Sequence, residues 1–156
     1  LRGFISETFH SRLIELARIE GVQHRLHFLA PAAPDQMEML SAAYDLGLVA
    51  ETGHTENRRI ALTNKLFTFA LAGVPAVISD IQSHRDYVSE AAGSARLFLV
   101  DNPVSLADAI DSFLMGDGHA LAESRLAAFD LGRTRLNWDL EQLVFLSCVE
   151  RSLENG

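Results

Sequence analysis

The chain has 156 residues, of which 48% are hydrophobic, and its 13 cationic and 21 acidic side chains give a formal net charge of −8. This length suits one domain that buries about 68–70% of the surface its unfolded chain would expose. The acidic balance argues against a nucleic-acid-binding protein, because binding to phosphates needs a basic face, and no apolar run approaches the roughly 20 residues of a membrane-spanning helix.

The first part of the chain alternates helical and strand-like patterns. Residues 7–20 carry apolar side chains at helical spacing, and residues 25–30 form a short apolar run that predicts a strand. A second helix is expected over 35–44 and a second strand over 46–50. The polar stretch 51–61 has no periodicity, which indicates a loop of functional length.

The rest of the chain continues this alternation. A helix over 63–72 is apolar on nearly every side, which indicates burial. Further strands are expected at 76–79 and 96–100, and further helices at 83–92, 103–114, 119–129 and from Asn137 onward. Strands that alternate with helices indicate βαβ units, and continuous apolar strands indicate burial on both faces. The predicted fold is α/β, an open parallel sheet of the Rossmann-like kind with helices on both faces.

The single lysine of the chain predicts an anion-binding site. Lys65 falls in the first turn of the apolar helix, directly after the N-cap candidates Thr63 and Asn64. The helix dipole repels cations at that end, yet Arg58 and Arg59 lie just upstream. A bound anion would explain three cations there, because free helix N–H groups and the dipole both favour one.

Two further considerations bear on this site. The cations would need no anion if they pointed into solvent or paired with Glu51 and Glu56. Ligands of open α/β sheets bind beyond the carboxyl ends of the strands, which adds the positions of Gly3, Ser79 and Asp80 to the candidates.

Other motifs are lacking. GxSxG, GxxxxGK[ST] and GxGxxG do not occur, and no acid or cysteine completes a metal site around His24 and His27, so neither a metal nor a cofactor is expected. The single cysteine, Cys148, cannot form an intrachain disulfide, which favours a reducing, cytoplasmic location. Its place on an apolar helical pattern predicts a small core residue.

The run from Glu51 to Asp80, ETGHTENRRIALTNKLFTFALAGVPAVISD, resembles bacterial glycosyltransferase group 1 proteins, a branch of which carries a segment like LTNKLFTYLLAGLPVVASD. Flanking segments at 24–48, 98–114 and 135–153 extend the resemblance over nearly the whole chain. The family has the two-domain GT-B fold and retains anomeric configuration. The resemblance implies that residues 1–156 are a single nucleotide-sugar-binding domain, the carboxyl-terminal donor half of a longer protein whose amino-terminal acceptor domain lies outside the chain.

The resemblance also implies roles for individual residues. The diphosphate would meet the N-terminus of the helix that begins near Asn64, with Arg58 or Arg59 as a clamp, sugar hydroxyls held by Glu51 and Asn57, and the nucleoside lined by Ser79 and Asp80. The expected catalytic residues are Lys65, Arg58 and Arg59, and the expected substrate-binding residues are Gly3, Glu51, Asn57, Thr63, Asn64, Thr68, Ser79 and Asp80. The donor nucleotide-sugar is a substrate, and the acceptor is a glycan, a lipid or another molecule.

One departure from the family pattern keeps alternatives open. The widespread family motif has two glutamates eight positions apart, and those places hold Ile60 and Thr68 here. A non-catalytic GT-B-like nucleotide-binding module is therefore an alternative to a transferase. A nucleotide-sugar epimerase-like enzyme, which needs its own carboxylates and histidine, is another alternative. The chain alone is expected to be inactive without its amino-terminal domain, and to self-associate through the apolar stripe of its last helix.

Overall fold

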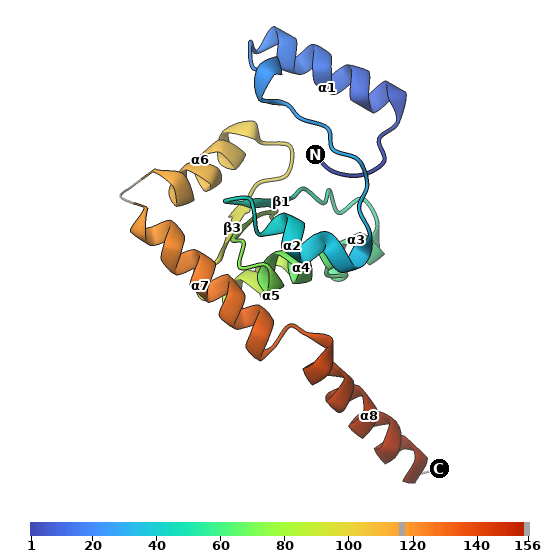
Figure 1. Ribbon diagram of the computed structural model, residues 1–156. Helices are drawn as coiled ribbons and strands as arrows, with labels where there is room; N and C mark the ends of the chain where they lie inside the picture. Colours follow the sequence, from blue (N-terminus) through green and yellow to red (C-terminus); the bar gives the residue numbers. More distant parts are fainter. Residues whose placement is uncertain (116–117, 155–156) are drawn as a thin grey trace. The chain divides into compact units, whose positions relative to one another are not determined.

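The computed structural model describes residues 1–115 and 118–154 (Figure 1). The chain divides into two compact units, Leu1–Met37 and Glu38–Gly156, and each is described by itself. The expectation of one binding domain over residues 1–156 stays a prediction. None of the helices in the described residues is both long and apolar enough to cross a membrane.

The first unit contains the expected helix α1 (Glu7–Ile19), whose N-terminus is capped by the Ser6 hydroxyl accepting from the Phe9 N–H at 3.3 Å. The prediction of a strand over residues 25–30 is wrong. That segment begins in the 3-10 turn η1 (Gln23–Arg25) and then forms a single parallel bridge, Arg2 with Leu29. A strand needs a partner along its length, and within this unit only the residues around Arg2 supply one.

A second 3-10 turn, η2 (Pro34–Gln36), leads into α2 (Met37–Ser41), so the helix expected over 35–44 is shorter than predicted. The strands expected next are confirmed as β1 (Gly47–Val49), β2 (Ala76–Ser79) and β3 (Ala95–Phe98). They pair in parallel in the order β1-β2-β3, with Ala76 opposite both Gly47 and Ala95. The remaining helices are α3 (Glu56–Ile60), α4 (Asn64–Leu71), α5 (Gln82–Glu90), α6 (Pro103–Leu114), α7 (His119–Thr134) and α8 (Trp138–Glu154).

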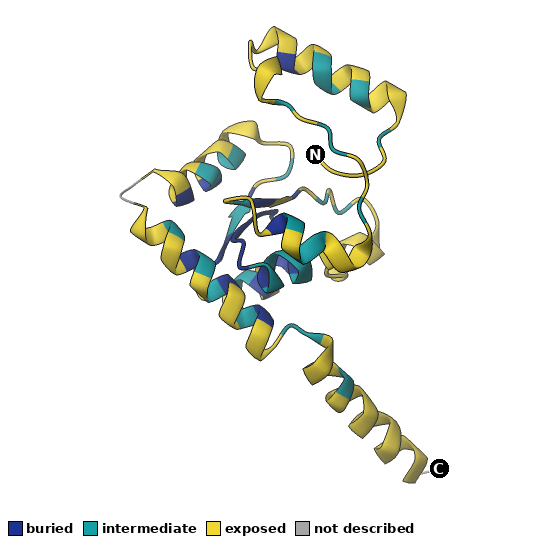
Figure 2. Cartoon of the chain, in the orientation of Figure 1, coloured by how far each residue is buried: buried dark blue, intermediate teal, exposed yellow. Residues whose placement is uncertain are grey.

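Helices cover both faces of this sheet, as predicted. Every residue of β2 is buried, and its side chains alternate between two apolar clusters. Ile78 packs with Leu66 of α4 and Tyr87 of α5 on one face. Val77 packs with residues of β3 and α6 on the other, Phe98, Ala109 and Phe113. Figure 2 shows the buried residues concentrated in and around the strands. The chain therefore folds as an open parallel sheet between helices.

The helix that carries Lys65 has the predicted limits. Thr63 is its N-cap, with the hydroxyl accepting from the Lys65 N–H at 3.1 Å, and Gly73 follows its end with a φ of +64°. Leu66 and Ala70 are its buried residues. The stretch 51–61 is not wholly irregular, because it contains α3, whose N-cap Thr55 accepts from the Arg58 N–H at 3.3 Å.

The prediction that Cys148 is a core residue is wrong. It is exposed on α8, a helix with no buried residue in the structure. Large apolar side chains along α8 are exposed as well, among them Trp138, Leu143, Val144 and Leu146, and Figure 2 shows this helix almost entirely as exposed. An apolar pattern identifies the stripe that a helix can bury, but it does not supply the surface that covers it.

A close approach between α4 and α7 predicts the effect of one substitution. A Cβ added at Gly132 would lie 2.8 Å from backbone atoms of Ala70 and Leu71. Gly132→Ala gains up to about 1 kcal/mol of helix propensity, but overpacking against a backbone costs about 1–3 kcal/mol. We expect a net loss of about 1–2 kcal/mol in the free energy of unfolding, measured by denaturant titration. Ala122→Ser, which adds an atom at an exposed position of α7, is the control and should change stability little. Equal stability of Gly132→Ala and the native protein would contradict this packing.

The exposed stripe of α8 leads to a second prediction. Apolar patches larger than a few hundred Å² usually bind a partner, so the polypeptide 1–156 should self-associate at high concentration. Light scattering should show less association for Leu143→Glu than for Leu126→Glu, which replaces a single exposed leucine of α7. A strictly monomeric polypeptide at high concentration would show that the apolar stripe of α8 does not mediate self-association.

Candidate functional site

The expected site residues of the second unit gather around the carboxyl edge of the sheet. β1 and β2 are parallel, so the residues that follow Val49 and Ser79 emerge at the same edge. The connection after β1 carries Glu51 and α3 and ends where α4 begins at Asn64. The first turn of α4 and the start of α5 therefore both lie at this edge, and the two helices pack on the same face of the sheet.

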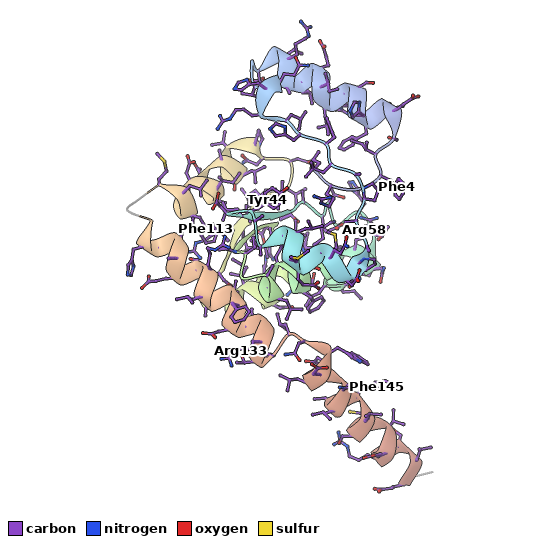
Figure 3. All side chains as sticks on the ribbon, in the orientation of Figure 1. Phe4, Tyr44, Arg58, Phe113, Arg133 and Phe145 are labelled. Carbon is purple, nitrogen blue, oxygen red and sulfur yellow. The ribbon has the colours of Figure 1, made fainter. Side chains whose placement is uncertain are left out.

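Glu51 is the centre of the charged groups at this edge. Its carboxylate accepts from Arg58 Nη1 at 2.8 Å through Oε2 and from Lys65 Nζ at 3.5 Å through Oε1. The Glu51 side chain is 17% exposed, whereas those of Arg58 and Lys65 are each 60% exposed. We call these three residues the Glu51 cluster; Figure 3 labels Arg58 on α3. The structure thus brings together one predicted acid and two predicted cations from three different elements.

Arg59 does not join this cluster. Its Nη1 lies 3.4 Å from Glu56 Oε2, and both side chains are largely exposed. The alternative considered from the sequence, in which the cations pair with Glu51 and Glu56, therefore describes the arrangement of all three cations in the structure.

The remaining predicted residues of this loop and helix differ in accessibility. Asn57 is exposed on α3, and Asn64 is exposed as the first residue of α4. Thr63 is half-buried as the N-cap of α4. Thr68 is half-buried one turn after Asn64, on the same face of the helix. Because Thr63 caps the Lys65 N–H, one of the free N–H groups of this helix end is already satisfied within the chain.

Ser79 and Asp80 end β2 and contact α5. Asp80 accepts from the guanidinium of Arg85, through Oδ1 from Nε and through Oδ2 from Nη2 at 3.2 Å. The carboxylate of Asp80 raises the pKa of Arg85 through this hydrogen bond and its charge. Ser79 is buried, and its carbonyl oxygen lies 2.7 Å from Nδ1 of His84. Both predicted residues are therefore held by the first turn of the next helix.

His84 is the residue at this edge that the sequence did not single out. It is fully buried, and burial lowers its pKa, although the hydrogen bond to Ser79 and the charge of Glu51 act in the opposite direction. A carbonyl only accepts, so Nδ1 donates to Ser79 and the neutral ring keeps Nε2 as an acceptor. Among the described residues, Nε2 of His84 is the buried side-chain polar atom that has no hydrogen-bond partner. Its place in the first helical turn after a buried strand was the available signal.

Gly3 belongs to the first unit. It has a φ of +128°, and its N–H donates to the Leu29 carbonyl at 3.2 Å. A positive φ of this kind favours glycine, which accounts for the residue type at this position without a ligand.

The geometry of the second unit is suited to an anion with several acceptor oxygens. Arg58 and Lys65 approach one carboxylate from α3 and α4, and both remain open to solvent. Cations beside a helix N-terminus stabilise phosphate groups and the charge that a departing phosphate gains. Glu51 occupies the position between these cations, so an incoming anion competes with it.

Comparison with known proteins identifies the fold. No family model matches the chain, and no curated protein does. Among solved structures, HepE of Anabaena, crystallised in complex with UDP-glucose, matches 100% of this chain with a TM-score of 0.76 at 18% sequence identity. The chain spans 40% of the length of that protein. The fold is that of the Rossmann-like half of a GT-B glycosyltransferase, as the sequence resemblance implied.

The buried imidazole of His84 predicts how stability depends on pH. Its pKa in the folded protein lies below the ordinary histidine value of about 6.5, so this histidine takes up a proton at a higher pH in the unfolded chain than in the folded one. The contribution of His84 to stability is present above pH 6.5 and is lost as the pH falls toward the folded pKa, with a slope of at most about 1.4 kcal/mol per pH unit. Denaturant titrations between pH 7.5 and 5 should show this decline, and His84→Gln should make it shallower. His24→Gln, at an exposed position of the first unit, is the control. An equal slope in His84→Gln and the native protein would contradict the assignment.

Proposed function

We propose that this chain is the donor-binding half of a retaining glycosyltransferase that transfers a sugar from a nucleotide-diphosphate sugar to a glycan, lipid or other acceptor. The observation that carries this proposal is the convergence of Arg58 and Lys65 on one anionic position at the start of α4. It is supported by a fold shared with a protein crystallised with UDP-glucose. An amino-terminal acceptor domain would complete the enzyme, and the single cysteine suits a reducing cytoplasm.

In this proposal the donor diphosphate lies at the N-terminus of α4. Lys65 and the Asn64 end of the helix contact the phosphates, and Arg58 or Arg59 closes over them as a clamp. These groups would stabilise the negative charge that the leaving nucleotide diphosphate gains. Glu51 and Asn57 are proposed to hold sugar hydroxyls, Thr63 and Thr68 to line the helix side of the pocket, and Ser79 and Asp80 to line the nucleoside side.

A second candidate function is a non-catalytic module that binds the nucleotide and does not transfer the sugar. The observation that favours it is the uncharged side chain at both positions of the family's glutamate pair. Ile60 is exposed at the end of α3, and Thr68 is half-buried in α4. Turnover by the intact protein, measured as release of nucleoside diphosphate from a nucleotide-sugar, would distinguish a transferase from such a module.

Calorimetric titration with UDP-glucose tests the proposed binding site directly. We expect saturable binding by the intact protein and competition between UDP-glucose and UDP, because the diphosphate supplies most of the charged contacts. Binding of glucose without UDP, or no binding of any nucleoside diphosphate or nucleotide-sugar, would refute the proposal.

Replacement of Lys65 tests its proposed role. Lys65→Ala should weaken the binding of UDP by about 1.5–3 kcal/mol, the usual contribution of a hydrogen bond to a charged group. Arg133→Ala is the matched control, because Arg133 pairs with Asp130 on the exposed side of α7. If Lys65→Ala and Arg133→Ala bind UDP equally well, the diphosphate does not lie at this helix end.

A further inference from the structure

The two cations of the Glu51 cluster are held by a carboxylate of the chain itself. Each oxygen of Glu51 faces one cation, Arg58 at 2.8 Å and Lys65 at 3.5 Å. The carboxylate is the least exposed member of the cluster, at 17% against 60% for each cation. Two cations from separate helices thus converge on one anionic group, with their remaining N–H donors open to solvent.

We propose that Glu51 is an internal counter-ion, which holds Arg58 and Lys65 in the unliganded protein and is displaced by a diphosphate group when that group binds. The identity of this ligand rests on the proposed function, but the exchange of partners follows from the geometry of the cluster. A diphosphate offers the same kind of acceptor oxygen as a carboxylate and carries more negative charge, so it competes for both cations at once.

The exposure of the two cations makes such an exchange inexpensive for them. Ion pairs of largely exposed cations contribute little to stability, because water solvates the separated cations well. Arg58 and Lys65 therefore lose little when they leave Glu51. While Glu51 stays in place, its charge repels the incoming anion at short range, which lowers the affinity of the site.

The surroundings of Glu51 contain a second group with unused bonding capacity. The ring of His84 is close enough for the charge of Glu51 to act on it, and its buried Nε2 has no partner among the described residues. Buried polar atoms are almost always paired. One acceptor at this edge of the sheet is therefore left without a partner within the described part of the chain.

The segment that carries Arg58 has few restraints against movement. α3 has five residues and none of them is buried. It is held to α5 by local contacts, such as the one between the Ser83 hydroxyl and the Ala61 carbonyl at 3.3 Å. When a diphosphate releases Arg58 from Glu51, residues 51–61 can therefore adjust around the ligand without disturbing the apolar clusters of the sheet.

The proposal is tested by removing the charge of Glu51 and measuring the affinity for pyrophosphate by calorimetry at fixed ionic strength in the intact protein. Glu51→Gln should bind pyrophosphate about five- to tenfold more tightly than the native protein, which corresponds to about 1–1.4 kcal/mol. Glu56→Gln is the matched control. It removes the carboxylate of α3 that pairs with Arg59 and, among the described residues, with no other cation. Its affinity for pyrophosphate should change less than about twofold, since exposed pairs contribute little.

Both variants should fold, because the freed cations are already largely exposed, and circular dichroism verifies this. Glu51→Ser, which also removes the charge, is the second variant and should tighten binding as well. Unchanged or weaker pyrophosphate binding by the Glu51 variants overturns the proposal, and so does equal tightening in Glu56→Gln.

A titration of the native protein with UDP-glucose distinguishes a failure of the counter-ion proposal from a failure of the proposed function. If UDP-glucose binds but the Glu51 variants do not gain affinity for pyrophosphate, the proposed function stands and the counter-ion does not. If the Glu51 variants gain affinity for pyrophosphate while UDP-glucose fails to bind to any form of the protein, the counter-ion proposal stands and the proposal of a nucleotide-sugar ligand is refuted.

Discussion

Every side chain of β2 is buried, and a parallel strand in that position needs apolar cover on both faces. α4 and α5 cover one face and α6 covers the other. Each connection between parallel strands must leave the carboxyl edge and return to the opposite one. The loop with α3, the first turn of α4 and the Ser79–His84 contact therefore lie around the same edge whatever their side chains are. The packing of the core determines which segments lie at this edge, and the side chains of those segments determine what can bind there.

The charges at this edge act locally against the charge of the whole molecule. A chain with a net charge of −8 repels anions at long range. Arg58 and Lys65 offset this repulsion only within a few ångströms, since salt screens exposed charges over about 8 Å at physiological ionic strength. Affinity for an anion must then come from direct contacts with these cations and with the end of α4. Glu51 therefore affects the affinity for an anion, because its carboxylate competes for the same two cations.

Local features of the sequence predicted most of the fold. Thr63, Gly73 and the apolar periodicity of 63–72 determine the limits of α4 through interactions within a few residues. The burial of Val77 and Ile78 on opposite faces followed from a continuous apolar strand. Features that depend on distant partners were not predictable in the same way. Residues 25–30 have strand-like composition and only a single bridge to pair with, and Cys148 lies on an apolar stripe that no described residue covers.

The same distinction applies to the site. The spacing of Arg58, Arg59 and Lys65 predicted a concentration of positive charge, since all three are close in sequence. The choice of partner was open, because the approach of Glu51 to Lys65, fourteen residues away, depends on the path of the loop. His84 was missed because its burial comes from the elements packed around it. Its place after a buried strand indicated the edge of the sheet, but not that the ring would be covered.

In the proposed transferase, the uncharged residues at the family's glutamate positions place a further constraint on catalysis. Ile60 and Thr68 offer no carboxylate to a hydroxyl of the proposed donor, whereas Glu51 and Asp80 are acids that follow β1 and β2 at this edge. Both are engaged, Glu51 by Arg58 and Lys65, and Asp80 by Arg85. Each oxygen of Glu51 accepts from one cation in the structure and keeps a further lone pair, and a diphosphate that attracts these cations would leave both oxygens available to a hydroxyl. Binding of the diphosphate and capture of the sugar would then be coupled through the same residue.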